Sequence, residues 1–147
     1  MEVPSTDRKL TRQENLEKEL LELILAFPEL NSALSDLEVS HTSEYHRPLF
    51  EYLKANTKFK FDDIIKALPN QEEYVKILSL KGEQQFADLT AHDKRLEAFT
   101  QVARIEDINK QIAKRRIAKE LSLAEADGDS KKTKELLRQY QALLNED

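Results

Sequence analysis

The sequence predicts an all-α protein, a compact multi-helix bundle joined by a long helix to a C-terminal helical hairpin. Gly occurs only 2 times and Pro 4 times in 147 residues, which is too few for the many turns of a β-rich fold. Apolar residues recur at three- and four-residue spacing through most of the chain, which is the period of an amphipathic helix. We expect a flexible lead-in at residues 1–10, a bundle at residues 11–103 and a hairpin at residues 104–147.

The first helix is predicted from a start signal and a stop signal. Thr11 is followed three residues later by Glu14, which is the pattern of a capping box, and an apolar run at helical spacing then leads to Pro28. Pro28 is tolerated in a first helical turn, so a short second helix is expected to follow through about Leu34.

Three further short helices are expected to complete the bundle. Ser43 or His46 can cap a helix that runs to about Asn56, and Asp62 can cap another that ends at Pro69. The next helix is expected to end at Gly82. Their apolar side chains have the spacing of one packed core: Leu49, Phe50, Leu53, Ile64, Ile65, Leu68, Tyr74, Ile77, Leu78 and Leu80.

A single long helix is expected next. Neither Gly nor Pro interrupts the chain between Gly82 and Gly128, and Thr90 with Asp93 can cap the start of a helix. Four of its residues are expected to pack on the bundle, namely Leu96, Phe99, Val102 and Ala103. Farther along, the apolar stripe changes phase between Ile112 and Ile117.

The last helix carries two pairs of adjacent leucines. A turn at residues 127–130 ends the long helix and returns the chain as a hairpin. In each of the pairs Leu136–Leu137 and Leu143–Leu144, the two adjacent side chains cannot point inward together, so one leucine of each pair is expected to pack in the hairpin. The other is available to a partner, which can be a different protein or a second copy of the chain, and Tyr140 is a suitable anchor.

Several classes of function are disfavoured by what the sequence lacks. With zero Cys, the chain has no disulfide, thiolate zinc site or cysteine nucleophile. No apolar run approaches the roughly 20 residues of a membrane span, and the first residues lack the apolar core of a signal peptide. The net charge of -5 argues against nonspecific nucleic-acid binding as the main task. We expect a cytoplasmic protein with no membrane partner and no requirement for nucleic acid.

No motif of an enzyme active site is present in the sequence. It contains no Gly-rich phosphate loop, no G-x-S-x-G elbow and no H-E-x-x-H motif. Its acidic pairs, Asp62–Asp63 and Glu72–Glu73, fall at predicted helix starts, where the helix dipole stabilises acids. The histidines lack metal-ligand spacing: His41, His46 and His92. We therefore expect no catalytic, cofactor or metal site and no small-molecule substrate.

Two stretches carry a resemblance to a known family. One is ENLEKELLELILAFPEL at residues 14–30, and the other is KRRIAKELSLAEADGDSKKTKELLRQYQALLNE at residues 114–146. In this order and spacing the chain resembles, over roughly residues 10–146, the C-terminal helicase-binding domain of bacterial DnaG-type DNA primases. The first stretch is similar to the opening helix of that domain, and the second is similar to its terminal hairpin.

The resemblance implies a role in DNA replication. It implies that the hairpin docks on the N-terminal domains of the hexameric replicative helicase, while the bundle modulates helicase activity. It also implies that this chain is a non-catalytic part of a larger primase, because neither the zinc-binding module nor the polymerase core of such enzymes is found in the sequence. We expect a monomer or a weak homodimer.

Mapped onto this sequence, the docking hairpin corresponds to about residues 105–147. The contact face is expected to comprise four residues that share one helical stripe: Leu137, Tyr140, Gln141 and Leu144. Three cations are expected at its rim: Arg115, Arg116 and Lys119.

Three other interpretations remain open. The N-terminal domain of the replicative helicase is the nearest, although residues 10–30 contain neither the Ala-Glu dipeptide nor the Gly expected there. A stand-alone helical adaptor that homodimerises would bury the same leucines. A nucleic-acid-binding helix could use the cations of residues 110–119, but no aromatic residue lies among them to stack on bases.

Overall fold

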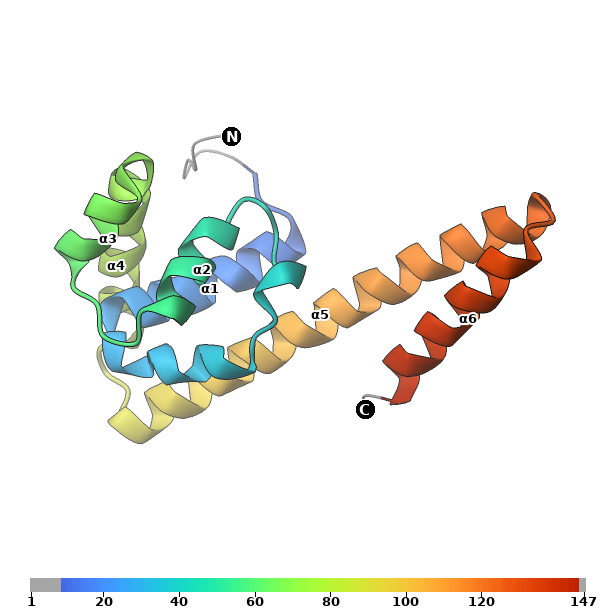
Figure 1. The fold of residues 1–147 in the computed structure, drawn as a ribbon. Helices are drawn as coiled ribbons and strands as arrows, with labels where there is room; N and C mark the ends of the chain where they lie inside the picture. The colour runs from blue at the N-terminus through green and yellow to red at the C-terminus, as the bar shows by residue number, and fades with distance from the viewer. Residues whose placement is uncertain (1–8, 146–147) are drawn as a thin grey trace. The chain divides into compact units, whose positions relative to one another are not determined.

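The computed structural model describes residues 9–145, and within that range it is helical without strands (Figure 1). The predicted all-α class is therefore confirmed. The chain divides into two compact units, one up to Glu106 and one from Asp107 onward. This division falls three residues after the boundary expected from the sequence, and residues 1–8 of the expected lead-in lie outside the described residues.

The first unit opens with α1 (Arg12–Ala26), whose start is the predicted capping box. The Thr11 hydroxyl accepts a hydrogen bond from the Glu14 N–H at 3.1 Å, and the Glu14 carboxylate accepts one from the Thr11 N–H at 2.9 Å. Two of the N–H groups that a helix start leaves without intrahelical partners are thereby satisfied.

The segment after α1 is helical but tighter than an α-helix. Residues Pro28–Asp36 form the 3-10 helix η1, and Val39–His41 form η2. Helix α2 (Arg47–Ala55) follows, and His46 stands at its N-cap position without making a side-chain capping bond. His46 is thus the N-cap residue by position, but its imidazole is fully buried and does not cap the helix, and the hydroxyl of the alternative cap, Ser43, donates to Glu17.

The remaining short helices of the bundle are α3 (Phe61–Ala67), η3 (Pro69–Gln71) and α4 (Glu72–Phe86). Asp62 lies within the first turn of α3 and is not its cap, whereas the Asp63 carboxylate accepts the Lys60 N–H at 3.2 Å. The helix expected to end at Gly82 continues to Phe86. The predicted positions of the acidic pairs in first turns are confirmed for both α3 and α4.

Gly82 lies inside α4 because the backbone of α1 passes very close to it. A Cβ atom at this position would meet the Glu22 carbonyl oxygen at 1.9 Å and the Ala26 Cβ at 2.8 Å. Only glycine permits this approach of two helix backbones. Gly82, which the sequence predicts as the end of a helix, is thus the residue at which α1 and α4 contact each other.

One apolar core holds the first unit together, and its residues come from α1, η1, α2, α3, α4 and the beginning of the next helix. The side chains predicted for this core are buried or half-buried, except Leu80, which is 59% exposed. The fully buried large side chains include Phe50, Leu20, Leu23, Ile24, Leu49, Leu53 and Leu78.

Helix α5 (Ala91–Ala126) is the predicted continuous long helix of 36 residues, and it contributes to both units. Thr90 caps its start by accepting the Asp93 N–H at 3.0 Å. Val102 is buried as expected, but the expectation for Leu96, Phe99 and Ala103 is wrong, since all three are exposed. The buried side chains of this part of α5 are Ala98, Gln101, Val102 and Ile105.

Hydrophobicity alone does not predict which face of α5 is buried against the first unit. The face that is buried contains the small Ala98 and the polar Gln101, whose amide donates to Glu19 of α1 at 3.3 Å and to Glu97 at 3.0 Å. The larger Leu96 and Phe99 lie on the other face. A small residue allows close packing of the helix, and an amide with acceptors can be buried at modest cost.

Candidate protein-docking surfaces of the hairpin

The second unit is a helical hairpin made of the end of α5 and helix α6 (Ser130–Asn145). Gly128 joins them with a positive φ of 70°, which is a backbone conformation that glycine adopts without strain. The Asp129 N–H bonds the Ala124 carbonyl at 3.0 Å and the Gly128 N–H bonds that of Glu125 at 3.2 Å, as in a Schellman motif. The Asp129 carboxylate then caps α6 by accepting the Lys132 N–H at 3.1 Å.

The hairpin has a small apolar core of its own. Ile117, Ala124 and Leu136 are buried in it, and the partly buried Leu121, Tyr140 and Leu143 pack against them. On α6 the residues Leu136, Tyr140 and Leu143 follow steps of four and three, so they form the stripe that meets α5. The prediction that one leucine of each adjacent pair packs inward is confirmed, with Leu136 and Leu143 inside.

The other leucine of each pair lies on an exposed strip beside that core. Leu137 and Leu144 are each 46% exposed, and Gln141 between them is exposed as well. At about 100° per residue, these three side chains are turned about 80° to 140° away from Leu136 on the same side of α6. We call them the α6 flank: Leu137, Gln141 and Leu144. Tyr140 joins the flank to the core, because it is half-buried and packs on the core residues.

The three cations expected at the rim lie on the other helix of the hairpin. Arg115, Arg116 and Lys119 are all exposed on α5. They are turned about 100° to 160° from Ile117, the residue that α5 directs into the hairpin core. The structure therefore brings the α6 flank together but places the predicted rim cations on the side of α5 that points away from α6.

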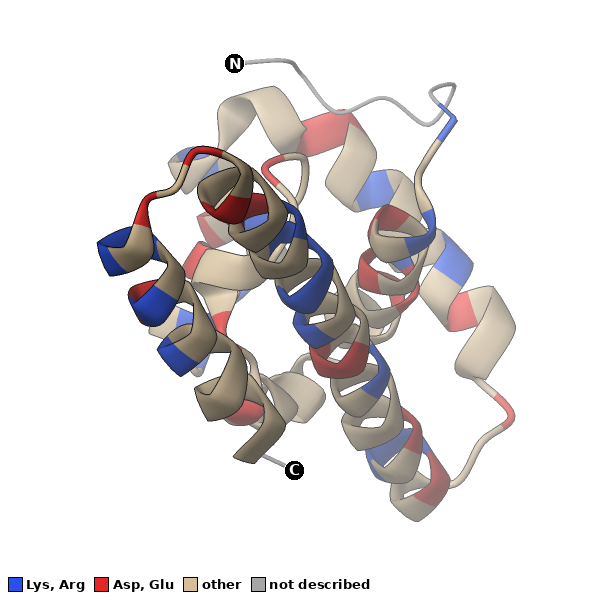
Figure 2. Cartoon of the chain, turned by 90° about the vertical axis from the view of Figure 1, so that its right-hand side faces the viewer, with Lys and Arg blue, Asp and Glu red and all other residues tan. Residues whose placement is uncertain are grey.

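Lysine and arginine residues recur along both helices of the hairpin (Figure 2). Exposed cations on α6 include Lys131, Lys132 and Lys134. One charge pair is well formed, because the Arg138 guanidinium donates to the Glu135 carboxylate at 2.6 and 3.1 Å. Hydrogen bonds from Arg138 and then Gln139 lower the pKa of the Glu135 carboxyl below its ordinary value. Arg115, Arg116 and Lys119 make no ion pair within residues 9–145.

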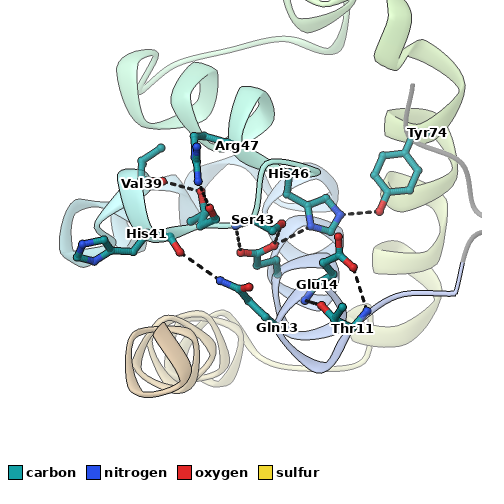
Figure 3. A network of polar contacts seen from close by, with 11 residues as sticks. Thr11, Gln13, Glu14, Val39, His41, Ser43, His46, Arg47 and Tyr74 are labelled. Carbon is teal, nitrogen blue, oxygen red and sulfur yellow. Dashed lines mark hydrogen bonds and ion pairs between the residues drawn. The ribbon is translucent and has the colours of Figure 1, made fainter. Parts of the chain in front are cut away.

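A polar network that no sequence pattern indicates is buried in the first unit (Figure 3). The Glu17 side chain of α1 is fully buried and accepts hydrogen bonds from the Ser43 N–H at 2.8 Å and from the Ser43 hydroxyl. The same carboxylate lies 3.0 Å from Nδ1 of His46, and Nε2 of His46 lies 2.7 Å from the Tyr74 hydroxyl of α4. Glu17, Ser43, His46 and Tyr74 form what we call the Glu17 network.

The Glu17 network has the connectivity of a structural anchor. The serine hydroxyl donates to the carboxylate and not to the imidazole, so His46 does not activate it as a base activates a nucleophile. His46 and Glu17 are each fully buried, and burial, followed by the charge of neighbouring groups, raises the pKa of Tyr74 far above its ordinary value. The phenol therefore keeps its proton, and the network ties α1, the segment before α2, and α4 together.

Further hydrogen bonds hold the same segment, residues 39–46, in place (Figure 3). The Gln13 amide donates to the His41 carbonyl at 3.1 Å, and the Thr42 hydroxyl donates to the Val39 carbonyl at 2.6 Å. The Arg47 guanidinium donates to the Thr42 carbonyl. Of these contacts, the one between Gln13 and His41 joins residues 28 positions apart, so no local pattern indicates it.

One open cavity of about 330 Å³ lies in the first unit, between the start of η1 and the chain before α3. Its lining includes Pro28 and Phe59, together with two lysines and two acids: Lys58, Lys60, Glu29 and Asp63. The cations and the acids balance, so the cavity has no preference for a ligand of one charge.

Two further observations concern metals and membranes. Within residues 9–145, no three side chains among His, Cys, Asp and Glu are close enough together to hold a metal ion. In the described helices, no stretch is both long and apolar enough to cross a membrane.

No family model matches this chain, and no match was found among curated proteins or solved structures. Its function is therefore inferred from the fold, from the surfaces of the hairpin and from the sequence resemblance.

Proposed function

We propose that this chain is the helicase-interaction domain of a bacterial DNA primase. In this role it docks primase on the hexameric replicative (DnaB-type) helicase and modulates helicase and priming activity at the replication fork, in the cytoplasm. The chain itself is non-catalytic in this proposal, and primer synthesis, a nucleotidyl transfer, belongs to the rest of the parent enzyme.

The observation that carries the proposal is the α6 flank. Leu137 and Leu144 are exposed at i and i+7, and Gln141 lies between them. Residues at this spacing form a continuous strip that fits a groove on another protein. Tyr140 lies half-buried next to the strip, and a phenol with one apolar side and one polar end is favoured in interfaces.

The sequence resemblance supplies the identity of the partner. It covers the opening helix and the terminal hairpin, and the hairpin is the part that docks in that family. The bundle that precedes the hairpin here is consistent with a two-part domain in which one part docks and the other modulates the helicase.

The test is a titration of the purified chain against the hexameric replicative helicase from the same genome. We expect wild-type chain to bind, and the Leu137→Ala/Leu144→Ala double variant to bind at least tenfold more weakly, since exposed apolar anchors contribute about 1 to 2 kcal/mol each. The matched control is Leu80→Ala/Leu96→Ala, which removes two similarly exposed leucines from the first unit. Equal affinity of the α6 variant and the control would contradict the assignment of the docking face.

A stand-alone homodimerising adaptor is the second candidate, because the α6 flank offers the same leucines to a second copy of the chain. Sedimentation velocity at increasing concentration separates the two functions. A concentration-dependent dimer that Leu137→Ala/Leu144→Ala abolishes, together with no binding to the helicase, would favour the adaptor.

A further inference from the structure

A second strip on the hairpin has the composition of a contact surface. Ile112, Arg116, Lys119 and Leu123 follow steps of four, three and four along α5, so their side chains lie within about 60° of one another around the helix. We call these four residues the α5 outer face. They point away from the side on which Ile117 and Leu121 meet α6.

The α5 outer face is exposed and its charges are not neutralised. Ile112 is 44% exposed and Leu123 is 58% exposed, and Arg116 and Lys119 are exposed between them. Neither cation has an ion-pair partner within residues 9–145. No acidic residue occurs between Ile108 and Lys119, whereas that stretch contains Lys110, Lys114 and Arg115 in addition.

The order of these residues indicates the chemistry of a matching surface. Two apolar side chains stand 11 positions apart, which is about 16 Å along a helix, and two cations lie between them. A complementary strip needs apolar contacts at its two ends and carboxylates in its middle. An acidic amphipathic helix of three turns or more supplies this pattern on one face.

We propose that the α5 outer face docks an acidic amphipathic helix of the protein to which the hairpin binds. The identity of that protein rests on the proposed function, whereas the chemistry of the contact rests on the α5 outer face alone. The hairpin then has two contact surfaces, the α6 flank and the α5 outer face, on different sides.

Other anionic partners fit the α5 outer face less well. Binding to nucleic-acid phosphates gives no role to Ile112 and Leu123, and the strip has no aromatic residue to stack on bases. A membrane-bound helix buries a broad apolar face, but here only two apolar residues are available on the strip.

The test measures binding of the full chain to the hexameric helicase by fluorescence anisotropy at several salt concentrations. Two double variants probe the strip: Arg116→Glu/Lys119→Glu for charge and Ile112→Ala/Leu123→Ala for the apolar ends. The control for charge is Arg95→Glu/Arg104→Glu, which makes the same change in net charge on exposed residues of the same helix in the first unit. All substituted side chains are exposed, and far-UV circular dichroism checks that helicity is kept.

We expect Arg116→Glu/Lys119→Glu to weaken binding about tenfold or more and to reduce its salt dependence, and Ile112→Ala/Leu123→Ala to weaken it several-fold. The control should change affinity less than twofold. If both strip variants bind like wild type while Leu137→Ala/Leu144→Ala does not, this inference is wrong and the proposed function stands. If the wild-type chain does not bind the helicase, both are wrong.

Labelled oligodeoxythymidine and phosphatidylglycerol vesicles are the probes for the other anionic partners. Binding to either probe as tight as that to the helicase, lost on charge reversal but unaffected by Ile112→Ala/Leu123→Ala, would overturn the proposal. Weak binding to both probes, insensitive to the apolar pair, together with the expected helicase result, supports it.

Discussion

At the scale of single residues, Glu17 is a buried carboxylate that joins separate segments of the first unit through hydrogen bonds. One buried carboxylate accepts from the backbone and hydroxyl of Ser43 and lies within hydrogen-bond distance of His46. A buried carboxylate is tolerated when several donors bond to it. Removing the carboxylate lowers the free energy of unfolding, because the donors then remain buried without an acceptor.

Glu17→Ala is therefore expected to lower the free energy of unfolding by about 3 kcal/mol. The measurement is urea denaturation followed by circular dichroism. Glu29→Ala, at an exposed position, is the control and should change stability by less than about 0.5 kcal/mol. A loss below about 1 kcal/mol in Glu17→Ala would show that the network adds little to stability.

Glu22 predicts how stability depends on pH. Burial raises the pKa of its carboxyl above the ordinary value, although Lys18 and Lys81 partly oppose this effect. A carboxyl whose pKa is higher in the folded than in the unfolded state favours folding only when protonated, and this advantage is lost as the pH rises through the folded pKa. The ionised form of Glu22 thus costs stability relative to its protonated form.

Glu22→Gln is expected to raise Tm at about pH 7, because the neutral amide avoids the burial of a charge. The gain should shrink or disappear at about pH 3.5, where both states of the wild-type carboxyl are mostly protonated. Thermal unfolding of both proteins at the two pH values checks this. An equal gain at both values would mean that ionisation of Glu22 is not the cause.

Individual positions were predicted well where the signal is local. The capping box of Thr11 and Glu14 is fixed by spacing within one helix and is confirmed, and so is the prediction that one leucine of each adjacent pair packs inward. His46 was missed because its partners, Glu17 and Tyr74, are 29 and 28 residues away in sequence. Such a site depends on the tertiary arrangement, which no short pattern encodes.

At the scale of elements, periodicity predicts the helices themselves. It does not predict which face of α5 is buried or that α1 contacts α4 at Gly82. The predicted long helix is present from Ala91 to Ala126, but Leu96 and Phe99, which the sequence predicts to be buried, are exposed, and Ala98 and Gln101 are buried instead. Hydrophobicity favoured the larger residues, whereas close packing and hydrogen bonding favoured the smaller and polar ones. Gly82 predicts a helix end because glycine often follows the last turn of a helix, but here it lies inside α4 where the backbone of α1 passes close by.

Gly82→Ala is expected to destabilise the protein by about 2 kcal/mol or more. Helix propensity alone would favour alanine by about 1 kcal/mol, but the new Cβ would lie 1.9 Å from the Glu22 carbonyl oxygen, so α1 and α4 must move apart. Chemical denaturation measures the change.

The matched variant is Gly128→Ala in the hairpin turn. There a Cβ meets no atom within 4 Å, and only the positive φ of 70° is strained, so a cost of about 1 kcal/mol is expected. A stabilised Gly82→Ala protein would mean that the two helices separate at little cost.

At the scale of the whole molecule, the two units differ greatly in the size of their cores. The first unit buries apolar residues from α1, η1, α2, α3, α4 and the start of α5, whereas the hairpin buries three and packs three more against them. The free energy of local opening follows the apolar contacts that an element makes. The hairpin is therefore expected to open more often than the bundle.

Amide hydrogen exchange tests this difference. We expect amides of α6 to exchange faster than those of Leu20 to Leu25 in α1. Leu136→Ala should reduce protection in α6 by roughly 30- to 100-fold, as expected for truncating a buried leucine, and leave α1 unchanged. A uniform decrease across the chain would mean that the two units unfold as one.

The small core of the hairpin also has a thermodynamic consequence for any partner. If α6 opens locally in the free chain, binding to a partner must first restore the helix. The apolar area removed from water on binding then includes the core of the hairpin as well as the interface. Such coupling produces a large negative heat-capacity change and an affinity that varies steeply with temperature. The Schellman turn at Gly128 limits this cost, because it fixes where the returning helix begins before a partner arrives.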